Sequence, residues 1–251
     1  MPGKAKKKTS TKPALSRANV ALKRKKTPKQ ILTNILWRVG KVLPGTPLRL
    51  NRSGMFPEAG VDEAGMSCLA GPVFAAAVIL PLGFRHELIR DSKQLDAAQR
   101  EEARQIIVEN AIAYAVASAD VSVIDEINIY HARFRAMHQA LEQLSVTPEF
   151  ILVDGNRFPA YKEIPHACCI KGDTKYMHIA AASILAKTAR DAYMLKLHEQ
   201  FPHYRWDSNK GYGTPDHRKA LVKHGSCEHH RTSFTLIRQF DVERYANVES
   251  V

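Results

Sequence analysis

The sequence lacks long apolar segments and cysteine patterns that bind metal. No run of 18 apolar residues occurs in the 251-residue chain, so no segment is expected to span a membrane. No apolar stretch typical of a signal peptide follows the start. The four cysteines (Cys68, Cys168, Cys169 and Cys227) form no CxxC pair and have no zinc-binding spacing, which favours buried thiols in a reducing compartment. We therefore expect a cytoplasmic protein.

Acidic residues are absent from the beginning of the chain. Residues 1–57 contain 15 of the 37 Lys and Arg residues, which leaves 22 against all 25 acidic residues in 58–251. We expect a disordered basic arm at 1–30, because its few apolar side chains cannot offset the entropy of ordering. The arm either adds non-specific affinity for phosphate backbones or is a solvated tail. A transit peptide would also lack acids, but it would favour arginine over lysine.

The remaining chain divides at a linker. Residues 31–55 combine a short apolar segment with a linker marked by proline and glycine, and 56–251 are expected to form one catalytic domain.

The stretch Ala59–Leu80, AGVDEAGMSCLAGPVFAAAVIL, is typical of two buried strands joined by a glycine-containing turn. Its second half is apolar without alternation, as in a strand covered on both faces. Asp62 and Glu63 interrupt the first half. Burying unpaired carboxylates is costly, so the pair indicates a nearby cation, although an acidic turn would explain a lone Asp-Glu. Only one of the two can lie squarely on a given face of the sheet.

Helices and strands alternate in the rest of the domain. Strands are expected at 111–118, 150–153 and 166–170, and helices at 96–110, 120–127, 131–144 and 176–200. On the helix at 131–144, His138 shares the apolar face with Phe134 and Met137, so we expect it to pack rather than to bind a ligand. This order predicts an α/β fold with a mixed β-sheet flanked by helices.

Two more acidic residues follow predicted strands. Asp154 and Asp173 lie just past strand ends, where α/β folds tend to place ligand-contacting groups. With Asp62 and Glu63 they make four carboxylates, which repel one another unless a cation neutralises them. Oxygen ligands with few histidines nearby suit Mg²⁺ or Mn²⁺ rather than zinc. Two such ions about 3.5–4 Å apart support phosphodiester hydrolysis.

Basic and amide side chains near these acids could contact phosphates, although each alone is more often an ordinary surface group: Lys93, Asn156, Lys171, Lys187 and Arg190. In the segment NKGYGTPDH, which has too much glycine and polarity for a core element, Tyr212 lies between two glycines. Its ring could stack against a sugar or base, or simply pack within a turn. The arrangement of His224, His229 and His230 around Cys227 fits no structural zinc pattern.

The motifs together resemble the bacterial ribonuclease HII family, the type 2 ribonucleases H, over about 58–238. The blocks that match, in the order of the family, are AGVDEAG, CLAGPVFAAAVILP, DSKQL, INIYHARFRAMHQAL, ILVDGNRFP, KGDTKYMHIAAASILAKTARD, NKGYGTPDH and HHRTSF. The resemblance implies a ribonuclease H-like fold with a C-terminal helical extension. It also implies cleavage of RNA in RNA–DNA hybrids and of ribonucleotides embedded in duplex DNA, leaving 5′-phosphate and 3′-hydroxyl ends. We expect a monomer.

The resemblance also implies roles for single residues. By position, Asp62, Glu63, Asp154 and Asp173 match the catalytic carboxylates that bind metal in the family. Tyr212 matches the tyrosine that stacks beside the ribonucleotide sugar and helps to sense its 2′-hydroxyl.

One element departs from the family pattern. After Asp-Glu-Ala the family has Gly-Arg-Gly, which reads the ribose at the RNA–DNA junction, and this chain has Gly65, Met66 and Ser67. Methionine offers no guanidinium to a phosphate, and serine adds a Cβ where glycine lets the backbone approach a sugar. A second hypothesis is therefore a hybrid- or duplex-binding protein with impaired cleavage or junction recognition. A third is a related nuclease of the same fold that cuts other nucleic acids. The four retained carboxylates favour the enzyme.

Overall fold

The computed structural model describes residues 48–49, 52–237 and 239. The basic arm predicted at 1–30 and most of the segment predicted at 31–55 lie outside these residues, so both stay predictions. In the described part of the chain, no helix is both long and apolar enough to cross a membrane. All four cysteines are free thiols, and two of them are buried.

The predicted mixed sheet is present. Its five strands lie in the order β3-β2-β1-β4-β5, with bounds β1 Glu58–Ala64, β2 Val73–Ile79, β3 Ala113–Ala119, β4 Phe150–Asp154 and β5 His166–Cys169. The predicted hairpin is formed by β1 and β2, which pair antiparallel, and β3 continues on the same side. On the other side, β4 and β5 run parallel to β1. The carboxyl ends of β1, β4 and β5 therefore share one edge of the sheet.

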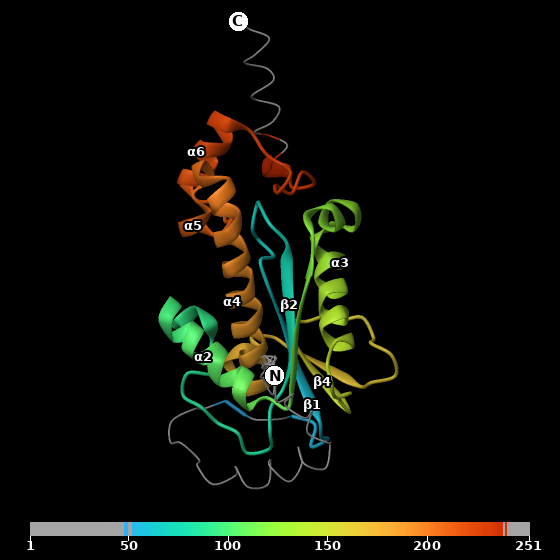
Figure 1. Ribbon diagram of the computed structural model, residues 1–251. Helices are drawn as coiled ribbons and strands as arrows, with labels where there is room; N and C mark the ends of the chain where they lie inside the picture. The colour runs from blue at the N-terminus through green and yellow to red at the C-terminus, as the bar shows by residue number, and fades with distance from the viewer. Residues whose placement is uncertain (1–47, 50–51, 238, 240–251) are drawn as a thin grey trace, which may run out of the picture.

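Five helices and three short 3-10 turns complete the described fold: α2 Ala97–Asn110, α3 Val121–Glu142, α4 Met177–Gln200, α5 Trp206–Asn209, α6 Pro215–His224, η1 Ser92–Gln94, η2 Gly172–Thr174 and η3 Pro202–Tyr204. Helix α3 covers one face of the sheet, and α4 with α2 covers the other (Figure 1). Along β2, Ala77 and Ile79 pack on the α3 side, whereas Ala76 and Val78 pack on the α4 side. Burial on both faces explains why this strand is apolar without alternation.

The predicted division of this helical region into two helices is confirmed. Within α3, Asn128 has non-helical dihedral angles, φ 63° and ψ 161°, so a first helix ends just before it and a second begins just after it, close to the predicted boundaries at Ile127 and His131. The side-chain oxygen of Asn128 accepts hydrogen bonds from the main-chain N–H groups of Tyr130 and His131. Asn128 is thus the N-cap of the second helix and marks the kink between the two.

The apolar face predicted in α3 is confirmed. Phe134, Met137 and Leu141 are buried in the core. The ring of His138 packs against that of Phe158, with 5.1 Å between the ring centroids, so His138 is a packing residue as predicted.

The segment 209–217 contributes to the core, contrary to the prediction from its polarity. Asn209 ends α5, and its buried amide donates a hydrogen bond of 2.7 Å to the carbonyl oxygen of Tyr204. His217 lies in α6, and its buried Nδ1 is 2.9 Å from the carbonyl oxygen of Tyr212. Polar side chains are tolerated inside a protein when their hydrogen bonds are satisfied, as they are here.

Helix α4 lies so close to β1 that only glycine fits between them. A Cβ atom on Gly60 would lie 2.1 Å from the carbonyl carbon of His178. Next to this contact, the buried ring of His178 accepts a hydrogen bond of 3.2 Å from the main-chain N–H of Leu80 at its Nδ1 atom. Burial lowers the pKa of His178 to about 4, so the ring is neutral in the folded protein at neutral pH.

This buried histidine should make the folded state sensitive to acid. The unfolded chain has an ordinary histidine pKa near 6.5, so between that value and about 4 the unfolded state binds more protons than the folded state. The contribution of His178 to the free energy of unfolding is fully present above pH 6.5. It is lost as the pH falls to about 4, a total of about 3 kcal/mol. Urea unfolding measures the free energy of unfolding at pH 7 and at pH 4.5. Between these two pH values it should fall further in the wild type than in His178→Gln. Equal losses would contradict this account.

Candidate active site

The four predicted carboxylates line one cavity at the shared edge of the sheet. Asp62 and Glu63 lie near the end of β1, Asp154 is the last residue of β4, and Asp173 lies in η2, just after β5. The cavity has a volume of about 310 Å³. Its other lining residues are Ala64, Gly65, Met66, Ser67, Ser92, Lys93, Ser183, Lys187 and Tyr212.

Asp62 and Glu63 contact opposite layers of the fold, as alternation along a strand predicts. Asp62 lies on the α4 side, where Ser183 hydrogen-bonds to its carboxylate. Its Oδ1 atom also accepts a hydrogen bond of 2.7 Å from the main-chain N–H of Glu63. Burial raises the pKa of Asp62 well above its usual range, and the charges of Glu63 and Asp154 raise it further.

Glu63 pairs with a cation that sequence reasoning missed, Arg133 of α3. The Nη1 atom of Arg133 is 3.3 Å from Oε1 of Glu63, and both side chains are largely buried. Burial raises the pKa of Glu63, and the charge of Arg133 opposes that rise. Within the described structure, Oε2 of Glu63 and Nε of Arg133 are buried without hydrogen-bond partners. The pair therefore satisfies Glu63 only in part.

The other two carboxylates are held by main chain and by lysine. Oδ1 of Asp154 accepts a hydrogen bond of 2.6 Å from the main-chain N–H of Gly172, which fixes η2 beside β4. The buried carboxylate of Asp173 lies 3.7 Å from Nζ of Lys93, a side chain that is 83% exposed. Burial raises the pKa of Asp173, and the charge of Asp154 adds to that effect.

The donor set fits a hard divalent cation. Four carboxylates line the cavity, and carboxylate oxygens are the ligands that Mg²⁺ and Mn²⁺ prefer. Across the described residues, no three acidic, histidine or cysteine side chains converge on one point as they stand. The contacts give the reason, because Glu63 is turned toward Arg133 and Asp173 toward Lys93. A divalent ion would compete with Arg133 and Lys93 for these carboxylates. The buried Oε2 atom of Glu63, which has no hydrogen-bond partner in the described structure, is available to bind it.

Two buried arginines hold the loop that joins β1 to β2. Arg231 donates hydrogen bonds of 3.1 Å and 3.0 Å to the carbonyl oxygens of Met66 and Gly71. Gly65 has a φ of +100°, and a Cβ there would lie 2.2 Å from Nε of Arg190. The main chain at these positions is therefore fixed. Met66 and Ser67 both line the cavity, and Met66 also packs against the core on the α3 side of the sheet.

Arg190 is placed differently from the sequence prediction. Its guanidinium is fully buried and donates hydrogen bonds to the carbonyl oxygens of Ala70, Pro72 and Lys210, at 3.0, 3.2 and 2.8 Å. It does not line the cavity, so the predicted phosphate contact is replaced by a role in holding two loops together. The sequence could not reveal this because the partners are main-chain atoms far away in the chain.

Tyr212 lies at the edge of the cavity, and this residue is 39% exposed. Its loop is fixed to the β1–β2 loop by a hydrogen bond of 2.8 Å from the N–H of Leu69 to the carbonyl oxygen of Gly211. The Nζ atom of Lys187 lies 5.7 Å from the centroid of the Tyr212 ring and 2.8 Å from a carboxylate oxygen of Asp191. An exposed ring and a nearby ammonium thus face the same space as the carboxylates.

Comparison with known proteins identifies the family. The family model described as Ribonuclease HII matches residues 59–237. The chain belongs to the ribonuclease HII family. It is 57% identical over 180 residues to the ribonuclease HII of Bacteroides thetaiotaomicron, across 72% of this chain and 90% of that protein. It is 55% identical to the ribonuclease HII of Christiangramia forsetii, across 71% of this chain and 90% of that protein.

A solved structure supports the same conclusion about the fold. The ribonuclease H2 from Pyrococcus horikoshii OT3 matches with a TM-score of 0.66 at 25% identity, covering 75% of this chain and 98% of that one. The ribonuclease H-like fold implied by the sequence resemblance is thereby confirmed. As a member of the ribonuclease HII family, the chain is a type 2 ribonuclease H, an endoribonuclease that acts on RNA–DNA hybrids.

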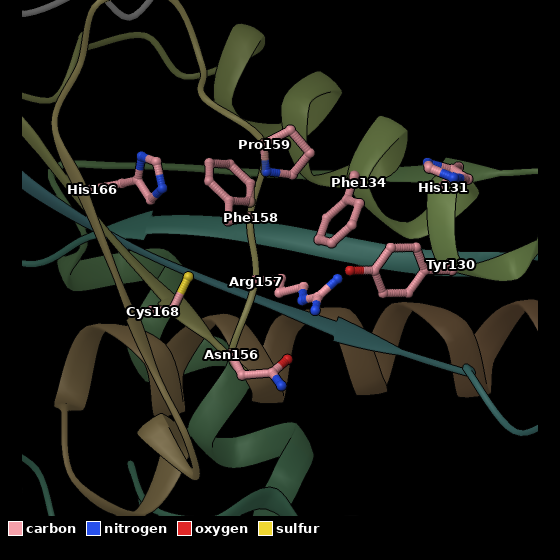
Figure 2. Close-up of a pocket in the computed structure, with 9 residues that line it drawn as sticks. All are labelled: Tyr130, His131, Phe134, Asn156, Arg157, Phe158, Pro159, His166 and Cys168. Atoms are coloured by element: carbon pink, nitrogen blue, oxygen red, sulfur yellow. The ribbon is translucent and has the colours of Figure 1, made fainter.

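Two of the residues predicted to contact substrate lie outside the cavity. Asn156 lies two residues beyond Asp154 and lines a second, neighbouring pocket, which Figure 2 shows. Lys171 is exposed before η2, in a left-handed conformation with φ 55°. The cavity therefore gathers Lys93, Lys187 and Tyr212, but not Asn156, Lys171 or Arg190.

The sequence carried a weak signal for the arginines that were missed. Arg133 lies within the INIYHARFRAMHQAL block and Arg231 within HHRTSF, both of which contribute to the family resemblance. A basic residue in a predicted amphipathic helix is normally solvated, so nothing in the local pattern distinguished Arg133 from Arg135.

These two arginines provide a matched test of the buried ion pair. Arg133→Gln should leave the Glu63 carboxylate buried without its cation, which typically costs about 3 kcal/mol. Arg135→Gln, on the exposed face of the same helix, should cost less than about 0.5 kcal/mol. Urea unfolding at pH 7 measures both values. Similar losses in the two variants would show that the Arg133–Glu63 pair contributes nothing specific.

Proposed function

We propose that this member of the family hydrolyses phosphodiester bonds at ribonucleotides paired to DNA, in continuous hybrids and at single ribonucleotides embedded in duplex DNA. It leaves 5′-phosphate and 3′-hydroxyl ends. The proposal is carried by one observation, that Asp62, Glu63, Asp154 and Asp173 line the same cavity as the exposed ring of Tyr212. The same activity is consistent with a role in DNA repair.

The four carboxylates would hold Mg²⁺ or Mn²⁺, with two ions as the expected number. A bound divalent ion supplies a nucleophile at neutral pH and stabilises the developing negative charge of the phosphate. The chain's own contribution is to keep the ligands in place, through Ser183 at Asp62 and the main-chain N–H of Gly172 at Asp154. Lys93 is exposed, so it can leave Asp173 and contact a phosphate instead.

The substrate side of the site is formed by two loops that are fixed to each other. Tyr212 would place its ring against the ribose, because the backbone on both sides of it is held by hydrogen bonds. Lys187 lies beside that ring and would contact a phosphate of the same strand. Gly65 lines the cavity, and Arg190 occupies the place where a Cβ atom at this position would lie. The residue must therefore be glycine, and its main-chain groups would lie close to the sugar.

The decisive experiment compares three duplexes with the full-length protein. One is a continuous RNA–DNA hybrid, the second is a DNA duplex with one ribonucleotide, and the third is all DNA. With Mg²⁺ or Mn²⁺, the first two should be cut and the third left intact. Tight binding of the first two without cleavage would instead support a hybrid-binding protein, and cleavage of the third would support a nuclease with a different substrate.

Asp154→Asn should reduce cleavage by roughly a hundredfold or more, a loss of about 3 kcal/mol in transition-state stabilisation. The fold should survive, because an asparagine oxygen can still accept the hydrogen bond from Gly172. Glu142→Gln is a suitable control, since Glu142 forms a surface ion pair with Lys162. The rate of cleavage of the hybrid and the unfolding curve are measured for both variants. A folded Asp154→Asn protein with normal turnover would refute the catalytic assignment.

Met66→Arg combined with Ser67→Gly should improve cleavage at a single embedded ribonucleotide. Both residues line the cavity, and Arg190 and Arg231 hold the backbone of the loop, so the double change adds a cation beside the carboxylates at the cost of the contact that Met66 makes with the core. A hydrogen bond from a charged group is worth about 1.5–3 kcal/mol, or roughly ten- to a hundredfold in rate. The gain in kcat/KM should be larger on the single-ribonucleotide duplex than on the hybrid.

One outcome would contradict impaired junction recognition in this chain. If the unmodified chain already cuts the single-ribonucleotide duplex selectively, and the double change adds nothing, then main-chain groups and Tyr212 suffice for junction recognition.

A further inference from the structure

A second pocket adjoins the active cavity on the α3 side of the sheet. It has a volume of about 470 Å³, within the range of small-ligand sites. Side chains of α3 and of the segments around β4 and β5 form it: Tyr130, His131, Phe134, Asn156, Arg157, Phe158, Pro159, His166 and Cys168. The chain connects the two sites directly, because Asp154 lines the cavity and Asn156 lines the pocket.

One side of this pocket is a row of aromatic rings, which Figure 2 shows as His166, Phe158, Phe134 and Tyr130. Neighbouring ring centroids are 5.2, 6.3 and 5.0 Å apart along the row. Phe134 and Phe158 are buried and fix the row, whereas Tyr130 is 37% exposed. The row thus offers a rigid aromatic surface that ends in an accessible ring.

The polar side of the pocket favours an anion. None of its lining residues is acidic. Asn156 and Arg157 are exposed, and in the described part of the chain no hydrogen bond or ion pair holds either side chain. Figure 2 shows Arg157 in the pocket beside Tyr130 and Phe134. Behind these two rings, the guanidinium of Arg133 lies 4.7 and 4.5 Å from their centroids, but it is paired with Glu63, so Arg157 is the cation that a ligand in the pocket would meet. A ligand with a flat ring and a negative group matches both sides.

We propose that this pocket is a subsite for one unpaired nucleotide of the substrate strand, next to the ribonucleotide where cleavage occurs. The base would stack on Tyr130, and the phosphate would contact Arg157 and Asn156. The nucleotide is unpaired because a base inside a duplex has both faces covered by its neighbours and cannot reach an aromatic surface. The inference rests on the proposed function, since it places the pocket beside a nucleic-acid cleavage site.

The subsite should give the enzyme a preference for ribonucleotides next to an unpaired nucleotide. The test uses two duplexes that contain one ribonucleotide, one fully paired and one with a 2-aminopurine nucleotide left unpaired beside it. The wild type should cut the second with a KM roughly tenfold lower, because stacking of one base contributes about that factor or more. Binding in EDTA should quench the 2-aminopurine fluorescence as the base stacks on the tyrosine.

Matched variants separate the subsite from the catalytic site. Tyr130→Leu keeps an apolar side chain over Arg133 but removes the ring, and Arg157→Gln removes the cation. Both should abolish the preference and the quenching while leaving cleavage of the fully paired duplex within about twofold. Tyr130→Trp should retain the preference. So should Tyr114→Leu, because Tyr114 is a tyrosine of similar exposure, 41%, on the distant edge strand β3.

Four results would contradict the subsite or the proposed function. A wild-type enzyme that cuts both duplexes equally would overturn the subsite, and so would a preference that survives Tyr130→Leu and Arg157→Gln. An equal loss on both duplexes in these variants would show that the residues support the catalytic site instead. If the wild type cuts neither duplex, the proposed function itself fails, and fluorescence quenching in EDTA still reports whether the pocket binds the unpaired base.

Discussion

The close contact between α4 and β1 determines where the functional side chains lie. Gly60 lets the helix backbone approach the strand more closely than any side chain would allow, and His178 anchors the same turn to the end of β2. This contact fixes the register of α4 along the sheet. Successive turns then bring Ser183 to Asp62, Lys187 to Tyr212 and Arg190 under the two loops. A shift of this helix would displace all three contacts together, because they lie on one rigid element.

The second constraint is electrostatic. Burial raises the pKa values of Asp62, Glu63 and Asp173, and two of these carboxylates are only partly compensated, Glu63 by Arg133 and Asp173 by the exposed Lys93. A site of this kind is costly without a cation, since like charges repel and desolvation penalises each of them. The local charge arrangement and the donor chemistry therefore support the same conclusion, that the site is built to receive divalent ions.

The β1–β2 loop is held by buried arginines, and two of its residues line the cavity where the substrate would bind. Arg190 and Arg231 bind main-chain carbonyl oxygens of the β1–β2 loop, so the path of this loop is held by main-chain contacts on both sides of Met66 and Ser67. These two positions line the cavity, so substitution there changes the groups that the cavity presents to a substrate. The aromatic pocket that Asn156 lines is separate from the carboxylate cavity, and its α3 side chains lie on the face of the sheet opposite α4.

The sequence by itself determined the features that depend on local patterns. Continuous apolar runs predicted buried strands, Asp96 predicted the start of α2, and acids at strand ends predicted the cavity, because parallel strands bring their carboxyl ends together. Only the tertiary structure decided which charged side chains face the site. Arg133 and Glu63 are 70 positions apart, and Arg190 and Ala70 are 120 positions apart. A charged side chain looks the same in sequence whether it is solvated or buried, and its partners are chosen by the packing of distant elements.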